Sequence, residues 1–464
     1  MNTTVSEFRG SVRAPGPPGA LGVRTLVRFA ADPLGLLRQV TEQYGDVISM
    51  KMLGKPTWLV NHPDDIEALL VKHARIMARD DGVVVLERVL GQGLLTSDGE
   101  LWKRQRKLMA EAFTPKRIHS YGAAMARVGD ASLRSWRNGA VINVHREMSR
   151  VTMDVVAAVL FGANLSEAEQ RMVSVSMDTI NEFLANSPEA IAQSVVGVPA
   201  WIPTPRNFRV ARAVSALDEL VFRIISERRG GKPIEDLLGT LLAAKDEEGS
   251  SMTDKQLRDE TMTLFLAGHE TTALMLANTL YLLSCNPDVE RKLYAEVAHV
   301  LGGRIPTADD VRALPYTDRV LKEAMRLLPP VWATGRKPTE DVEIRGHVIP
   351  KGSQILFSQW VVHHDRRWFP NPEGFDPDRW TAERSKDLPR YAYFPFGGGP
   401  RTCIGNHFAT MEAALLLAMI VQKWKLELLP GQTLELTPSV TLRPKGPGLR
   451  MHLTERFPVE PVLA

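Results

Sequence analysis

The sequence predicts a mainly α-helical protein with small β-sheets, which is the α+β class. Three observations lead to this prediction. The composition is globular, with 464 residues of which 44% are hydrophobic and 24% are charged. Helical patterning dominates from about residue 100 to residue 330, and short strands separated by Pro and Gly turns lie toward the two ends of the chain. A chain of this length can bury a large core and still enclose a cofactor.

The N-terminal end of the sequence differs from the rest. Residues 1–20 are expected to form a loose tail that ends in a stiff turn, Pro-Gly-Pro-Pro-Gly, at 15–19. Residues 21–464 are expected to form a single domain, because no repeat, low-complexity tract or interdomain linker interrupts them.

A short β-rich patch follows the tail. Residues 47–52 and 57–60 alternate in polarity or carry β-branched side chains, which favours two strands with a turn at Gly54-Lys55. A helix is expected to open after Pro63, since proline suits the first helical position.

The strongest single prediction is a long helix from about Thr253 to Ser284. Thr253 and Gln256 have the spacing of a capping box, and Asn286-Pro287 supplies the stop. A helix of roughly 32 residues spans about 48 Å. It would therefore cross the whole molecule.

Beyond Pro330 the chain becomes mixed and rich in proline. Strands are expected near 342–344 and 354–357. A strongly apolar helix follows from Phe408 to about Trp424, and short strands lie between 425 and 453. This end of the chain therefore adds small sheets to a helical body.

Charge and cysteine content exclude several classes of protein. The net charge is only +3, from 57 basic and 54 acidic residues, which argues against nucleic acid as a partner. The two cysteines, Cys285 and Cys403, are too few for a disulfide-stapled secreted protein and favour a reducing cytoplasm. No apolar run approaches the ~20 residues of a membrane span, so no transmembrane anchor is expected. We expect a cytoplasmic monomer.

The most informative segment is Phe-Gly-Gly-Gly-Pro-Arg-Thr-Cys-Ile-Gly, from Phe396 to Gly405. It places Cys403 just before a helix, where unpaired N–H groups are expected to lower the pKa of the thiol. The glycines let backbone amides point at the sulfur, as in metal–thiolate sites. The alternative is a structural cysteine that serves as a small hydrophobic residue.

This decamer resembles the haem-binding signature of cytochromes P450, Phe-x-x-Gly-x-Arg-x-Cys-x-Gly, at every fixed position. The resemblance implies a P450-type fold with a long central helix over heme b (iron protoporphyrin IX). It also implies that Cys403 binds the iron, that Arg401 pairs with a haem propionate and that Phe396 packs beside the sulfur. The remaining residues that it places against the haem are Ala267, Gly405 and Ala409.

The long helix carries Ala-Gly-His-Glu-Thr-Thr at 267–272, in the middle of an apolar face. Glycine, two threonines and a carboxylate there oppose helix propensity, and threonine hydroxyls can bond to i−4 carbonyls. A polar stripe on the surface is the alternative. The segment resembles the P450 oxygen-binding groove, which implies that Glu270 and Thr271 deliver protons. His269 is expected to be a packed histidine and not a ligand.

Other motifs occur in family order. Glu323 and Arg326 alone would be read as a solvated surface pair, but with the later Arg379 they resemble the buried P450 network that braces the cysteine loop. Trp102-x-x-x-Arg106 and Arg336 resemble groups that bind the haem propionates. Buried propionates require cationic partners, which supports this interpretation.

The resemblance implies a monooxygenase that inserts one oxygen atom of O2 into an apolar small molecule of fatty-acid, terpenoid or steroid type. Electrons would come from a ferredoxin and its reductase, and a basic run at 103–107, with Lys116 and Arg117, is either part of the docking face or an ordinary solvated charge run. The alternatives are a haem-thiolate peroxygenase or isomerase and a non-catalytic haem sensor. The expected lining of the substrate pocket is a loop at 83–90, Ala267, Thr271, 331–334 and 440–441, with 199–205 over an entrance.

Overall fold

The structure is a computed structural model that describes residues 14–162, 166–186, 189, 198, 202–230, 236–446 and 448–456. The chain divides into two compact units. The first comprises residues 1–82, 333–370 and 389–402, and the second comprises 83–332, 371–388 and 403–464. Residues 1–13 of the expected tail, and residues 199–201 of the expected entrance segment, lie outside the described residues. The single domain from 21 to 464 stays a prediction.

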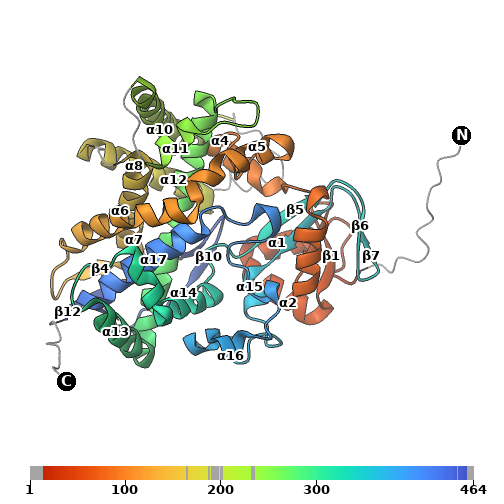
Figure 1. Cartoon of the computed structure of the whole chain (residues 1–464). Helices are drawn as coiled ribbons and strands as arrows, with labels where there is room; N and C mark the ends of the chain where they lie inside the picture. Colours follow the sequence, from red (N-terminus) through yellow and green to blue (C-terminus); the bar gives the residue numbers. More distant parts are fainter. Residues whose placement is uncertain are drawn as a thin grey trace, which may run out of the picture. The chain divides into compact units, whose positions relative to one another are not determined.

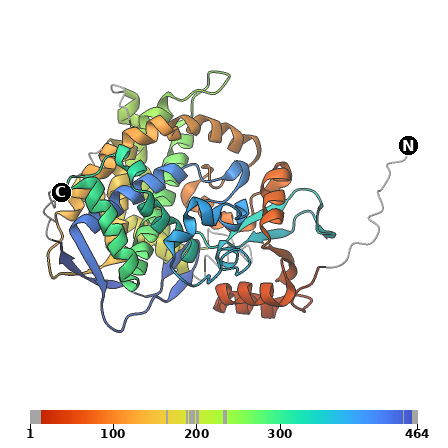
Figure 2. The same cartoon turned by 60° about the horizontal axis from the view of Figure 1, so that its bottom comes forward.

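The first unit is built on a five-stranded sheet with the order β1-β2-β8-β5-β3. Strands β1 and β2, at the red end of the colour scale, lie beside β5 and β8, in cyan (Figures 1 and 2). β1 and β2 pair antiparallel around a turn at Leu53-Gly54, one residue before the expected turn, and β2 then pairs parallel with β8. The strands of this unit are β1 (Val47–Met52), β2 (Lys55–Val60), β3 (Met77–Ala78), β5 (Thr334–Pro338), β6 (Val342–Ile344), β7 (His347–Ile349) and β8 (Gln354–Phe357).

Short helices accompany this sheet. α3 begins at Pro63, as expected, and the ring of His62 caps it by accepting a hydrogen bond from the N–H of Asp64 at 3.3 Å. The described end of the predicted tail is bonded to the sheet, because the Ser49 N–H donates to Pro15 O at 2.9 Å. The helices and helical turns are α1 (Val23–Ala31), α2 (Pro33–Tyr44), α3 (Pro63–Glu67), η1 (Ala68–Lys72), η2 (Ala74–Ile76), η3 (Asp81–Val83), α15 (Gln359–His363), η8 (Arg390–Ala392) and η9 (Gly399–Arg401).

The second unit is mainly helical, which confirms the predicted fold class. Its longest helix is α12, which packs against α7, α10, α14 and α17 (Figure 1). The helices and helical turns are α4 (Val84–Leu90), α5 (Gly99–Ala110), η4 (Glu111–Phe113), α6 (Pro115–Leu133), α7 (Val144–Phe161), α8 (Glu167–Asn186), α10 (Pro205–Gly230), α11 (Leu237–Ala243), α12 (Asp254–Cys285), α13 (Pro287–Leu301), η6 (Ala308–Ala313), α14 (Pro315–Leu327), η7 (Pro377–Trp380), α16 (Ala382–Ser385) and α17 (Asn406–Lys423).

The predicted long helix is confirmed within one residue at each end. The Thr253 hydroxyl accepts from the Gln256 N–H at 3.2 Å and the Gln256 side chain accepts from the Thr253 N–H at 3.0 Å, so both halves of the capping box form. Asn286 caps the other end. Cys285 is the last helical residue and is exposed.

Two small sheets complete the second unit. They comprise β4 (Val141–Asn143), β12 (Arg450–Glu455) and β9 (Trp424–Leu428) in one sheet, and β10 (Leu436–Pro438) with β11 (Leu442–Pro444) in the other. α17 begins at Asn406, two residues before the expected start, and ends where Trp424 opens β9. Among the described residues, no helix combines the length and the apolar composition that a membrane span needs.

The segment at 83–90 was expected to be a loop, and this expectation was wrong. The structure has a helix, α4, which ends at Gly91, a residue with a positive φ of 57° whose N–H donates to Glu87 O at 2.8 Å. Val85, Leu86, Val89 and Leu90 of α4 join the apolar core of the second unit. Burial of this apolar face outweighs the weak helix propensity of the valines.

Candidate active site

The predicted thiolate loop runs to the end of the first unit and continues into the second. Residues 396–402, including Phe396 and Arg401, belong to the first unit, and the second unit resumes at Cys403. Gly399 adopts a φ of +66°, and a Cβ at this position would lie 1.9 Å from Leu70 O. Only glycine fits there. The loop is therefore packed tightly against η1.

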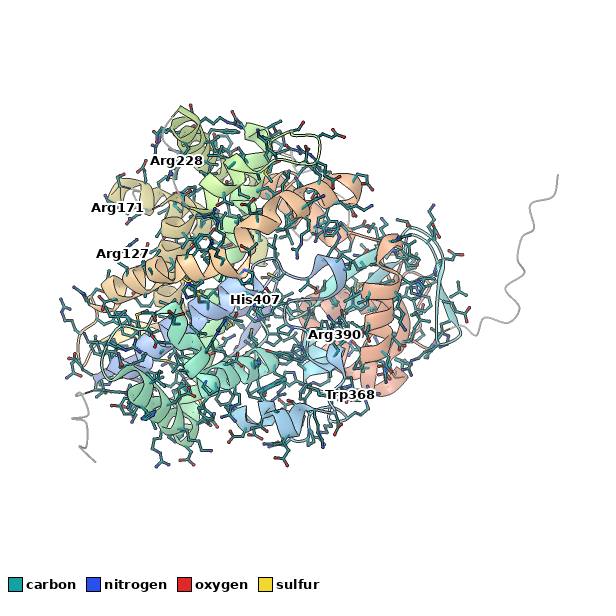
Figure 3. All side chains as sticks on the ribbon, viewed as in Figure 1. Arg127, Arg171, Arg228, Trp368, Arg390 and His407 are labelled. Carbon is teal, nitrogen blue, oxygen red and sulfur yellow. The ribbon has the colours of Figure 1, made fainter. Side chains whose placement is uncertain are left out.

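Cys403 precedes α17 by three residues, and His407, labelled in Figure 3, marks the first turn of this helix. The sequence predicts a lowered pKa for the Cys403 thiol, and for the polypeptide without a bound metal this prediction was wrong. Burial raises the pKa of the Cys403 thiol, and the Gly405 N–H and the charge of Arg106 oppose that rise only in part. The residue still keeps exposed surface. A metal ion bound to the sulfur would deprotonate it regardless, because coordinated thiols are anionic.

Arg106 of α5 is the cation whose field reaches Cys403. Burial lowers the pKa of its guanidinium, and the only group that opposes this is the Cys403 sulfur. In the part of the chain that the structure describes, Arg106 forms no ion pair with a carboxylate. A half-buried cation without a carboxylate suits an acidic group of a ligand, as the propionate prediction requires.

One face of α12 is accessible in the middle of an otherwise buried helix. Leu264, Ala267, Gly268 and Thr271 retain accessible surface at this point, and they follow the i, i+3, i+4, i+7 spacing of a single helical face. The two predicted contacts Ala267 and Thr271 lie on it. This face provides surface for a ligand against the centre of the helix.

As the sequence predicts, the threonine hydroxyls of the 267–272 segment bond to i−4 carbonyls and His269 is packed in the interior. The Thr271 hydroxyl donates to Ala267 O at 2.7 Å and the Thr272 hydroxyl donates to Gly268 O at 3.0 Å. His269 is buried, its Nδ1 lies 3.0 Å from Phe265 O, and burial lowers its pKa. His269 is therefore a packed histidine.

Glu270 is held by the turn that leads into β11. The Thr441 hydroxyl and the Arg443 Nε each donate to its Oε1 at 2.5 Å, and Arg443 also forms an ion pair with this oxygen. Burial alone would raise the pKa of Glu270, but the charge and hydrogen bond of Arg443, with the Thr441 hydroxyl, bring it below its ordinary value. Glu270 is therefore a buried carboxylate with a fixed position.

These contacts of Glu270 were missed by the sequence analysis. Thr441 was expected to line the pocket, and Arg443 was given no role. The two residues are about 170 positions from Glu270 in the chain, so no local pattern joins them. A buried carboxylate in a helix does require a cation, and this requirement was the one available signal.

The predicted Glu323–Arg326–Arg379 network is present and fully buried. Glu323 accepts from Arg326 Nε at 2.9 Å, from Arg326 Nη2 at 2.8 Å and from Arg379 Nε at 3.2 Å. The indole of Trp380 adds a further hydrogen bond to Glu323 at 2.9 Å, which sequence reasoning missed. Arg326 also donates to the carbonyls of Pro372 and Gly374. The network thus joins α14 to η7.

The remaining predicted residues fall in separate parts of the chain. Trp102 lies on α5, Gly405 caps α17, and Ala409 follows one turn later, where its N–H donates to Gly405 O at 2.8 Å. Arg336 lies in β5 of the first unit, where it is buried and donates to Gly335 O at 2.7 Å.

The basic run at 103–107 is less available as a docking surface than the sequence suggests. Lys103 pairs with Glu100, Arg104 pairs with Asp246 at 2.7 Å, and Lys107 pairs with Glu247. Lys116 and Arg117, at the start of α6, form no ion pair within the described ranges. With Arg106, they are the cations of this predicted face that form no ion pair among the described residues.

Comparisons with known proteins identify the family of the chain. The profile of the family "Cytochrome P450" matches residues 15–451. Cyclooctatin synthase of Streptomyces melanosporofaciens is 38% identical, with 91% of each chain covered. Cyclooctat-9-en-7-ol 5-monooxygenase of the same organism is 34% identical over 93% of this chain and 91% of that protein. Pentalenene oxygenase of Streptomyces avermitilis is 32% identical over 89% of this chain and 91% of that protein.

Solved structures give the same result. The haem domain of cytochrome P450DA has a TM-score of 0.86 and 28% identity, covering 97% of this chain and 99% of that one. Cyanobacterial CYP120A1 bound to retinoic acid has a TM-score of 0.83 and 27% identity, covering 96% of this chain and all of that one. The chain belongs to the cytochrome P450 family and is an oxidoreductase.

Proposed function

We propose that the protein is a haem-thiolate monooxygenase that hydroxylates an apolar terpenoid. The observation that carries the proposal is Cys403, an exposed residue just before α17, with a half-buried Arg106 whose charge acts on the thiol and which has no carboxylate partner among the described residues. The names of the relatives support the substrate class, since two of them are oxygenases of the terpenoids pentalenene and cyclooctat-9-en-7-ol.

The residues present fit heme b as the cofactor. Cys403 supplies a thiolate ligand, and the Gly405 N–H lies where it stabilises the anion. Arg106 supplies a cation for a propionate, and by family correspondence Trp102, Arg336 and Arg401 serve the same two acids. Contacts with the ring are proposed for Ala267, Phe396, Gly405 and Ala409.

When it is bound, haem with a thiolate ligand supplies the activation of dioxygen. The chain's own residues supply protons and exclude water. Glu270 is ionised and fixed through Oε1, so it can accept a proton and pass it on. The Thr271 hydroxyl, which donates to Ala267 O at rest, can rotate to donate toward the accessible face of α12.

We further propose that a ferredoxin and its reductase supply the electrons, and that the protein acts as a cytoplasmic monomer. Lys116 and Arg117 are the candidate docking cations. An acidic ferredoxin would be attracted to them over a distance set by ionic strength. Reduction rates that do not respond to salt would remove this docking face.

The test is oxygenation with defined substrates. Purified protein, ferredoxin, reductase and NADPH would be incubated with pentalenene or cyclooctat-9-en-7-ol under 18O2, and products would be identified by mass spectrometry. We expect one 18O atom in an alcohol. Thr271→Ala should keep consuming oxygen while it yields less alcohol and more hydrogen peroxide. Turnover with peroxide alone, and none with the reductase system, would favour a peroxygenase instead.

A further inference from the structure

Two adjacent carboxyl groups of α12 hold the turn that follows α4. The Gln92 N–H donates to Asp259 Oδ2 at 3.0 Å, and the Leu94 N–H donates to Glu260 Oε2 at 2.9 Å. Both carboxyl groups are buried, and Glu260 is completely so. Two side chains that neighbour each other on one helix thus bind alternate amides of one turn.

Gly93 allows the turn after α4 to approach α12 closely. A Cβ on Gly93 would lie 2.1 Å from Thr263 Oγ1 and 2.6 Å from Asp259 O, so only glycine lets the turn reach the helix. From the other side, the Gln105 amide of α5 donates to Gln92 O at 2.6 Å. α4, α5 and α12 therefore meet at this turn.

The two carboxyl groups differ in their partners. Asp259 pairs with Lys255 at 2.9 Å and with Arg258 at 3.0 Å. Glu260 has no cationic partner in the described structure, and its Oε1 is buried without a hydrogen bond. Burial raises the pKa of Glu260 to about 8. At neutral pH the contact to Leu94 is therefore made by a neutral acid.

Two arginines on these helices bond to groups other than Glu260. Arg258 bonds to Asp218 of α10 at 2.7 Å as well as to Asp259. On α4, Arg88 donates to Asn207. Asp259 is the one charged group among the described residues whose field acts on Glu260, and it disfavours ionisation.

We propose that Glu260 is a positioning residue whose buried carboxyl fixes the turn after α4 to α12, and that this contact holds α4 in place beside the substrate site. The second half rests on the proposed function. If opening of the turn hydrates Glu260, the opened state releases its proton near the ordinary pKa of about 4.3. Opening should then become about tenfold more favourable for each pH unit up to about pH 8.

The direct test is hydrogen exchange of the full-length protein, corrected for intrinsic rates, at pH 6, 7 and 8. We expect protection of the Leu94 amide to fall about fiftyfold from pH 6 to pH 8, because Glu260 is itself half ionised in the closed state at about pH 8. In Glu260→Gln, which keeps a neutral acceptor, this dependence should vanish while protection stays high. The matched control is Glu412→Gln, which removes another fully buried carboxyl, on α17, and should leave the Leu94 dependence intact. Equal pH dependence in wild type and Glu260→Gln would overturn the proposal.

A second measurement tests whether the turn positions α4 beside the substrate site. Glu260→Leu removes the carboxyl that accepts from the Leu94 N–H, so we expect it to weaken binding of pentalenene at least fivefold by spectral titration, whereas Glu260→Gln should bind like wild type. Equal binding by all three proteins, despite altered exchange, would refute the role of the turn in positioning α4. Exchange needs neither substrate nor turnover. An experiment that disproves the role of the Glu260–Leu94 contact is therefore distinguishable from one that disproves the proposed hydroxylation.

Discussion

At the scale of single residues, Glu270 shows how environment fixes the state of an acid. Burial alone would favour the neutral form, but Arg443 and Thr441 bind Oε1 and reverse this preference. Among the described residues no hydrogen bond reaches Oε2. Nearby, burial together with the charge of Arg443 lowers the pKa of His145 to about 4, so it is neutral at physiological pH. Arg443 is thus the cation that keeps Glu270 ionised.

Removal of this cation should invert the pH dependence of stability. In the wild type the pKa of Glu270 is lowered, so its contribution is present above about pH 4.5 and is lost as the pH falls. In Arg443→Met the carboxyl stays buried without a cation and its pKa rises. We expect a loss of about 3–5 kcal/mol at pH 8 that shrinks toward pH 4, measured by urea unfolding.

The control for this prediction is Lys445→Met, which breaks the exposed pair with Glu435, two residues that flank the same small sheet. It should cost less than about 1 kcal/mol at every pH. Arg443→Lys should restore part of the stability. A loss in Arg443→Met that does not change between pH 4 and pH 8 would show that Arg443 acts by packing alone.

At the scale of elements, the Glu323 network joins α14 to η7 through charge-assisted hydrogen bonds with no exposed surface on Glu323 or Arg326. Glu323→Leu would leave two buried guanidinium groups without their carboxylate. We therefore expect a loss of about 3–5 kcal/mol in the free energy of unfolding, measured by urea titration. Lys292→Met, which breaks an exposed pair with Asp378 of the same η7, should cost less than about 1 kcal/mol. Equal effects of the two variants would contradict this account.

Helix ends and turns show which elements the sequence can predict. The capping box at Thr253 and the proline at 63 act locally, so α12 and α3 were predicted at the correct positions. α4 was not, because its helical state depends on burial of Val85, Leu86 and Val89 against distant segments. Propensity alone gives no such signal.

At the scale of the whole molecule, the site residues that can be predicted from the sequence are those that belong to short motifs. Short sequence motifs contain Cys403, Arg326 and Thr271, and the residue types and spacing of these motifs indicate their chemistry. The contact between Glu270 and Arg443 and the contact between Glu260 and Leu94 are not predictable in this way, because each joins residues more than 160 positions apart. The pKa of Cys403 was mispredicted because the burial of the sulfur depends on the packed fold.

The central claim is that the sulfur of Cys403 is the ligand of a haem iron. The most direct measurement is the absorption spectrum of the purified protein after reduction and exposure to carbon monoxide. We predict the strongly red-shifted Soret band of a thiolate-bound haem in the wild type and its loss in Cys403→Ser. A wild-type protein without haem, or with the band of a nitrogen-ligated haem, would contradict the account.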